Sequence, residues 1–61
     1  MNPRQGTART RRILLVDDDA DFRWATGNIL RTAGYDAMEA EDGRTALRLV
    51  EREIPDLILL D

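Results

Sequence analysis

The feature that most constrains the fold is an uninterrupted apolar run that ends in three acids. Residues 13–19 read Ile-Leu-Leu-Val-Asp-Asp-Asp. Four aliphatic residues without alternation suit a strand that is buried on both faces, as strands of parallel sheets are. The acids follow the carboxyl end of that strand, where open α/β sheets bind ligands. Two carboxylates brought together repel each other unless a cation lies between them, so Asp17 and Asp18 indicate a hard divalent ion, Mg²⁺ above all.

Two helices and two further strands are predicted after these acids. The first helix has Asp19 as its N-cap and Gly34 just beyond its end. A short, partly polar strand is expected over residues 35–40, and a second helix begins after Asp42 and ends before Pro55. Residues 57–60 form a second fully apolar strand. The predicted core faces are Phe22, Ala25, Ile29, Leu30 and Ala33 in the first helix, and Ala46, Leu47, Val50 and Ile54 in the second.

The alternation of strands with helices implies an α/β fold in which right-handed crossovers join parallel strands. The polar second strand suits an edge, which gives the strand order 2-1-3. The first and third strands are then neighbours about 4.8 Å apart and point the same way. Asp61 would end level with Asp17 and Asp18. We therefore expect a Mg²⁺ site made of three carboxylates, one of which could act as a nucleophile towards a phosphoryl group.

Four segments together resemble the first half of a response-regulator receiver domain. They are ILLVDDD, the helix ending in AGY, EAEDGRTAL and IPDLILLD, and they cover residues 13–61. The resemblance implies a partial flavodoxin-like doubly wound parallel sheet, a βαβαβ unit that lacks the last two strands and three helices of the family. It implies that Asp61 accepts a phosphoryl group from a sensor histidine kinase or a phosphotransfer protein. It also implies that Asp18 binds Mg²⁺ directly and that Asp17 helps to hold the ion, often through water.

The sequence departs from the family pattern after Asp61. It contains no Lys, and the Thr or Ser that the family carries at the end of its fourth strand has no counterpart. Receiver domains use these residues when they assist their own phosphorylation and dephosphorylation, so an enzymatic role stays open. We expect a fragment of a longer regulator, which would contact nucleic acid only through an absent output domain. The third strand would expose an unpaired edge, which favours self-pairing or pairing with a complementary half.

Three alternatives compete with a phosphoacceptor. The pair Asp17 and Asp19 is similar to the acids of haloacid-dehalogenase-type phosphatases, but Asp21 stands where those enzymes have Thr or Val. An EF-hand calcium loop that begins at Asp17 would need Gly and Glu where the chain has Phe22 and Asn28. The runner-up is a receiver-like interaction module that no longer accepts phosphate and works by pairing with a partner.

Charge is divided unevenly along the 61 residues, whose net charge is −3. Residues 1–12 contain four Arg and no acid, whereas residues 13–61 contain five Arg and twelve acids. We expect residues 1–12 to be a basic flexible leader, although its arginines would also suit nucleic acid or an acidic partner. The chain has no Cys, which excludes disulfides and thiolate metal sites. Because no apolar run approaches the roughly 20 residues that span a bilayer, we expect no membrane contact and a cytoplasmic location.

Overall fold

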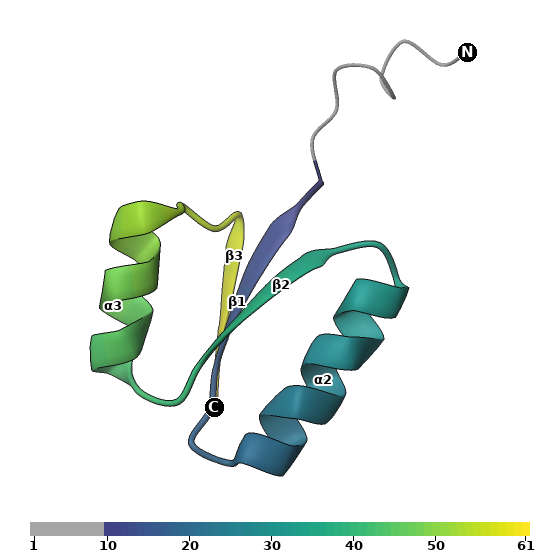
Figure 1. The fold of residues 1–61 in the computed structure, drawn as a ribbon, viewed down its shortest axis with the longest axis horizontal. Coiled ribbons are helices and arrows are strands. Elements are labelled where there is room, and N and C mark those ends of the chain that lie inside the picture. Colours follow the sequence, from purple (N-terminus) through teal and green to yellow (C-terminus); the bar gives the residue numbers. More distant parts are fainter. Residues whose placement is uncertain (1–9) are drawn as a thin grey trace, which may run out of the picture.

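The computed structural model describes residues 10–61, in which the five predicted elements are all present. They are β1 (Arg12–Val16), α2 (Ala20–Thr32), β2 (Asp36–Ala40), α3 (Gly43–Arg52) and β3 (Leu57–Leu60). The strands are parallel and lie in the order β2-β1-β3. Figure 1 shows α2 and α3 on opposite sides of the sheet. The predicted α/β class and the strand order 2-1-3 of a partial flavodoxin-like fold are therefore confirmed.

Side-chain caps determine where both helices begin. Asp19 accepts a hydrogen bond from the backbone N–H of Phe22 at 3.1 Å, and Asp42 accepts one from the backbone N–H of Thr45 at 2.8 Å. Each cap satisfies an amide that the first helical turn leaves without an intrahelical partner. Beyond the end of α2, Gly34 adopts a φ of 99°, in the left-handed region that glycine enters without steric cost. Both predicted N-caps and the glycine stop are confirmed.

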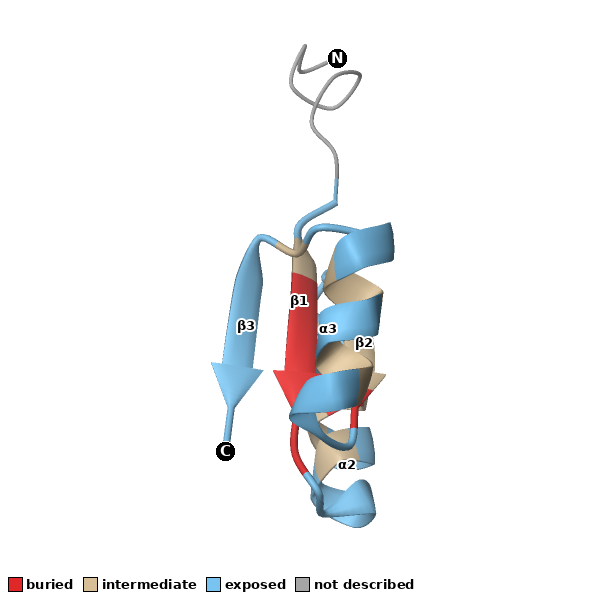
Figure 2. Ribbon diagram, turned by 90° about the vertical axis from the view of Figure 1, so that its left-hand side faces the viewer, coloured by how far each residue is buried: buried red, intermediate tan, exposed pale blue. Residues whose placement is uncertain are grey.

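A cluster of apolar core residues lies between the sheet and α3. Leu14 and Val16 of β1 are buried with Ala40 of β2, and Leu14 has no exposed surface. The partly buried residues that pack against this cluster are Met38, Ala46, Leu49 and Val50. Figure 2 shows that burial is concentrated in the central strand β1, whereas β3 at the edge is exposed along its length.

The predicted core face of α2 is wrong at four of its five positions, because only Leu30 is partly buried. Phe22 and Ile29 are 60% and 67% exposed. A different face of the helix meets the sheet, since Arg23 forms an ion pair with Glu39 of β2. The charged contact, rather than the apolar stripe, therefore marks the side of α2 that faces the strands.

The predicted core face of α3 is partly correct. Ala46 and Val50 pack against the core cluster as expected. Leu47 is 68% exposed, and Ile54 is 75% exposed because it lies beyond the last residue of the helix. Leu49 packs against the cluster instead, so the buried face is shifted around the helix relative to the predicted one.

Arg12 anchors the amino-terminal end of the sheet. Its guanidinium forms ion pairs with Asp36 at 3.2 Å and Glu53 at 3.6 Å, and its backbone N–H donates to Asp56 at 2.7 Å. β1 begins at Arg12, one residue before the predicted strand start.

The first nine residues of the predicted basic leader lie outside the described part of the chain. Within residues 10–61, neither helix has the length and apolar character that crossing a membrane requires.

Candidate functional site

The sheet itself places two of the predicted acids side by side. Asp17 directly follows β1 and Asp61 directly follows β3, and the last paired residues of these strands, Val16 and Leu60, lie opposite each other. The backbone N–H of Asp61 donates to Val16 O at 3.2 Å, and that of Asp17 donates to Ala40 O at 3.1 Å. The main-chain hydrogen bonds of the sheet therefore continue into both acids, which explains why two residues so far apart in the sequence meet.

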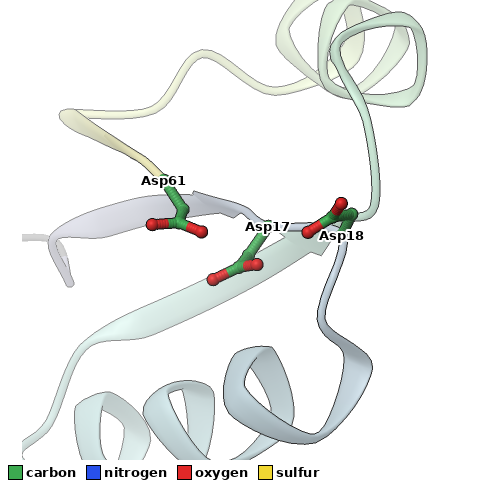
Figure 3. Close-up of side chains that lie close together, drawn as sticks. All are labelled: Asp17, Asp18 and Asp61. Carbon is green, nitrogen blue, oxygen red and sulfur yellow. The ribbon is translucent and has the colours of Figure 1, made fainter.

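All three predicted carboxylates converge at this edge. One oxygen from each of Asp17, Asp18 and Asp61 lies within 4.8 Å of the other two. Figure 3 shows Asp17 and Asp18 at the end of β1 and Asp61 at the end of β3, with their carboxylates on the same side of the strand ends. Asp17 is buried, whereas Asp18 and Asp61 are exposed. The acidic cluster is thus open to solvent through two of its three members.

Asp17 is the most firmly held of the three. Its Oδ1 accepts a hydrogen bond from the backbone N–H of Asp19 at 2.9 Å, and its carbonyl oxygen accepts one from Nη1 of Arg23 at 2.6 Å. In the part of the chain that the structure describes, its second carboxylate oxygen, Oδ2, accepts no hydrogen bond. The side chain is therefore oriented by one oxygen and offers the other to a ligand.

The donor set of the acidic cluster fits a hard divalent cation. Three negative charges at this spacing repel one another unless a positive charge lies among them. Mg²⁺ binds to proteins through one or two carboxylates and completes its shell with waters and phosphate oxygens. Because Asp18 and Asp61 are exposed, the cluster leaves room for such additional ligands. Asp17, Asp18 and Asp61 are therefore residues that could hold Mg²⁺ in this chain.

An open pocket of about 260 Å³ adjoins the acidic cluster. Asp17 and Asp61 line it together with apolar side chains that include Phe22 and Leu59. Arg23 also lines this pocket and brings a positive charge close to the acids. Phe22, the first residue of the exposed apolar stripe of α2, thus borders a hollow beside β3 rather than the buried core.

The sequence analysis did not predict the ion pairs that join α2 to β2 next to the acidic cluster. Nε of Arg23 lies 3.4 Å from Oε1 of Glu39, and Nη2 of Arg31 lies 3.0 Å from Oε2 of the same carboxylate. Arg31 also donates to Ala37 O at 2.7 Å. A signal was available, since residues eight apart on a helix differ by only about 80° around its axis. Two arginines on one side of the helix, followed by a glutamate in the next strand, indicate a contact between the two elements.

The sequence profile described as the response regulator receiver domain matches residues 13–61. The chain belongs to this family. A similar protein is the CAI-1 autoinducer sensor kinase/phosphatase of Vibrio cholerae, which is 39% identical over 97% of this chain and 9% of its own length. The alkaline phosphatase synthesis transcriptional regulatory protein of Bacillus subtilis is 43% identical over 84% of this chain and 21% of its own length.

A third relative of this receiver chain is sporulation initiation phosphotransferase F of Bacillus subtilis, 40% identical over 82% of this chain and 40% of its own length. The receiver chain thus spans less than half the length of each of these relatives. No solved structure matches it significantly. In this receiver segment the acidic cluster lies beyond the carboxyl ends of the strands, the edge at which doubly wound α/β folds bind their ligands.

Proposed function

We propose that this receiver segment is the phosphoacceptor of a two-component relay, in which Asp61 receives a phosphoryl group from a sensor histidine kinase or a phosphotransfer protein. The observation that carries the proposal is the convergence of the Asp61 carboxylate with those of Asp17 and Asp18. Membership of the receiver family supports a role in two-component signalling. A sensor kinase and a phosphotransferase among the relatives support the proposed partners.

In the proposed transfer, a carboxylate oxygen of Asp61 attacks the phosphorus atom of a phosphohistidine. The new O–P bond forms as the N–P bond breaks, and the electron pair stays on the imidazole nitrogen, which takes up a proton. Asp61 suits this role because its side chain is exposed while its backbone N–H is bound to β1. Mg²⁺, held by Asp17, Asp18 and Asp61, would supply positive charge that offsets the charges of the carboxylates and the phosphoryl oxygens.

The test uses small phosphoryl donors in place of the unidentified kinase. The purified chain is incubated with Mg²⁺ and either acetyl phosphate or phosphoramidate, whose N–P bond is like that of phosphohistidine. We expect intact-protein mass spectrometry to show the addition of one phosphoryl group. Because an acyl phosphate reacts with hydroxylamine, hydroxylamine treatment should remove the group. Chelation of the Mg²⁺ should prevent its addition.

Asp61→Asn is the decisive variant, because the amide keeps the shape of the side chain but is a far weaker nucleophile. Asp21→Asn is the matched control, since Asp21 is an exposed acid in the first turn of α2. We expect Asp61→Asn to abolish the addition and Asp21→Asn to leave it unchanged. Persistent phosphorylation of the Asp61→Asn chain, or none at all in a chain with the expected far-UV circular dichroism, would contradict the proposal.

The open edge of β3 favours a second candidate function, that of an interaction module that does not accept phosphate. Within the described residues, β3 pairs only with β1, and its four residues are between 39% and 76% exposed. An apolar edge strand with unpaired backbone groups is a template for pairing with another strand. A second copy of the chain or a complementary half would satisfy it. Absence of phosphorylation together with a concentration-dependent dimer in analytical ultracentrifugation would favour this candidate.

A further inference from the structure

Arg23 is the more deeply buried of the two arginines of α2. Only 18% of its side chain is exposed, against 43% for Arg31. Nη1 donates to the carbonyl oxygen of Asp17 at 2.6 Å, while Nε faces the Glu39 carboxylate at 3.4 Å. A single planar group thus joins the loop that carries the acids to the edge strand β2.

The hydrogen bond from Arg23 acts on the peptide unit that links Asp17 to Asp18. A peptide unit is planar, so the direction of the Asp17 carbonyl also sets the direction in which Asp18 leaves it. The other main-chain group of Asp17, its N–H, is already bound to Ala40 O. Arg23 therefore holds the peptide plane that joins the first two residues of the acidic cluster.

Glu39 in turn holds Arg23 in place. Nε of Arg23 is buried and makes no hydrogen bond to any residue from 10 to 61, so the Glu39 carboxylate is what compensates this part of the guanidinium charge. The second oxygen of Glu39 is bound by Arg31 at 3.0 Å. A buried charge that loses its partner is costly, which favours the observed arrangement over one in which Arg23 swings out to solvent.

We infer that Arg23 is a positioning residue for the acidic cluster: held by Glu39, it orients the Asp17–Asp18 peptide so that both carboxylates meet that of Asp61. The inference rests on the proposed Mg²⁺ and phosphoryl site. The guanidinium fork is essential to it, because one nitrogen faces a carbonyl oxygen while another faces a carboxylate. A lysine ammonium is a single point of charge and does not reproduce that geometry.

The test measures metal affinity in the full 61-residue chain. Mn²⁺ serves as the probe because electron paramagnetic resonance reports the free ion directly, and Mg²⁺ is then added as competitor. Substitution of a residue that orients a metal ligand without touching the metal typically weakens metal binding 10- to 100-fold. We therefore expect Arg23→Lys to weaken Mn²⁺ binding about tenfold. Glu39→Gln should give a smaller loss, because the amide oxygen still faces Arg23 without a full negative charge.

Two control variants separate positioning from stability. Arg48→Lys makes the same substitution at an exposed position of α3 and should leave the affinity unchanged. Leu49→Ala removes a side chain from the core on the other side of the sheet and should lower stability without lowering the affinity of the folded chain. Far-UV circular dichroism establishes that each variant is folded.

The outcomes distinguish this inference from the proposed function. If the wild-type chain does not bind Mn²⁺, or if Asp18→Asn binds it as tightly as the wild type, the proposed metal site is contradicted. The inferred role of Arg23 is then contradicted as well. If the wild type binds and Arg23→Lys binds equally well, only the inference is overturned. Equal losses in Arg23→Lys and Leu49→Ala, or an unfolded Arg23→Lys chain, would show that Arg23 acts on stability alone.

Discussion

On the α3 side of the sheet, Leu14, Val16 and Ala40 form a buried cluster with apolar residues of the helix. On the α2 side, Ile13 and Leu15 are equally buried in the sheet, but the helix above is joined to β2 through the pairing of Arg23 and Arg31 with Glu39. Apolar packing is non-directional and grows with the area removed from water. Ion pairs are directional and stabilise little when they are exposed to solvent.

The two sides of the sheet therefore have different roles: the α3 side mainly stabilises the fold, and the α2 side mainly orients the acidic cluster. The acids at the end of β1 lead directly into α2, so the helix that is held by directional contacts is the one joined to the site. The helix that is held by apolar contacts does not follow the β1 acids directly, and it packs Ala46, Leu49 and Val50 against the core cluster of the strands. We therefore expect substitutions on the α3 side to change mainly the free energy of unfolding, and those on the α2 side to change mainly the geometry of the acidic cluster.

The largest expected effect is that of Leu14→Ala, because Leu14 is completely buried in the core cluster. Truncation of a buried leucine costs about 2–5 kcal/mol, through lost burial and the cavity left behind. That is a large share of the stability of so small a chain. Urea unfolding followed by circular dichroism measures the loss. Leu47→Ala, which removes the same atoms from a residue that is 68% exposed, is the control and should change the free energy of unfolding little.

Glu39→Ala is expected to have a smaller effect on stability and one that depends on salt. It leaves the largely buried Arg23 without its carboxylate, which we expect to cost about 1–2 kcal/mol. Because salt screens charges that are partly exposed, the difference from wild type should shrink as the NaCl concentration rises. The effect of Leu14→Ala should not shrink in this way. An equal response of both variants to salt would remove the distinction between the two sides of the sheet.

Gly27→Ala examines how closely α2 approaches β2. A Cβ at this position would lie 2.7 Å from Oε2 of Glu39 and 3.0 Å from Nη1 of Arg31. Alanine favours a helix over glycine by about 1 kcal/mol, but the Glu39 carboxylate would have to move and lose its contact with Arg31. We expect little net change in the wild-type background and a gain approaching about 1 kcal/mol in a Glu39→Ala background. The coupling between Gly27 and Glu39 is measured by the urea unfolding midpoints of four chains: the wild type, Gly27→Ala, Glu39→Ala and the double variant.

A gain of the same size in both backgrounds would contradict the interpretation of Gly27. It would mean that the Glu39 carboxylate moves aside without cost, and that its contacts with the two arginines do not hold the helix in place. The inferred role of Glu39 in fixing Arg23 would then lose its support.

The strand order and the meeting of Asp17 with Asp61 were predictable because they depend on main-chain patterns. An unbroken apolar run marks β1, and parallel neighbours necessarily end at the same edge of a sheet. The rotation of α2 was not predictable from its apolar stripe. Phe22 and Ile29 fit the helical period, but the helix meets β2 through Arg23 and Glu39, which are distant from each other in the sequence and carry no apolar signal. Periodicity locates apolar faces, and it does not detect charges that meet across elements.

The smallest expected effect concerns Asp42, the charged N-cap of α3. The backbone N–H of Thr45 is the main cause that lowers the pKa of Asp42 below its ordinary value of 3.8, and the Thr45 side chain, Arg44 and Arg48 act in the same direction. A lowered pKa means that the charged cap stabilises the fold fully above the ordinary value. That contribution is lost as the pH falls through the lower value of the folded state.

Asp42→Asn isolates this contribution, because asparagine caps a helix about as well as aspartate but carries no charge. We expect the wild type to be slightly more stable at neutral pH, and the gap to close below pH 3.8, the ordinary value for this carboxyl. Urea midpoints of the two chains measured between neutral and acidic pH test this, since the other carboxyls titrate equally in both. A gap that stays constant with pH would mean that Asp42 acts on α3 only through its hydrogen bond and that its charge contributes nothing to the stability of the helix.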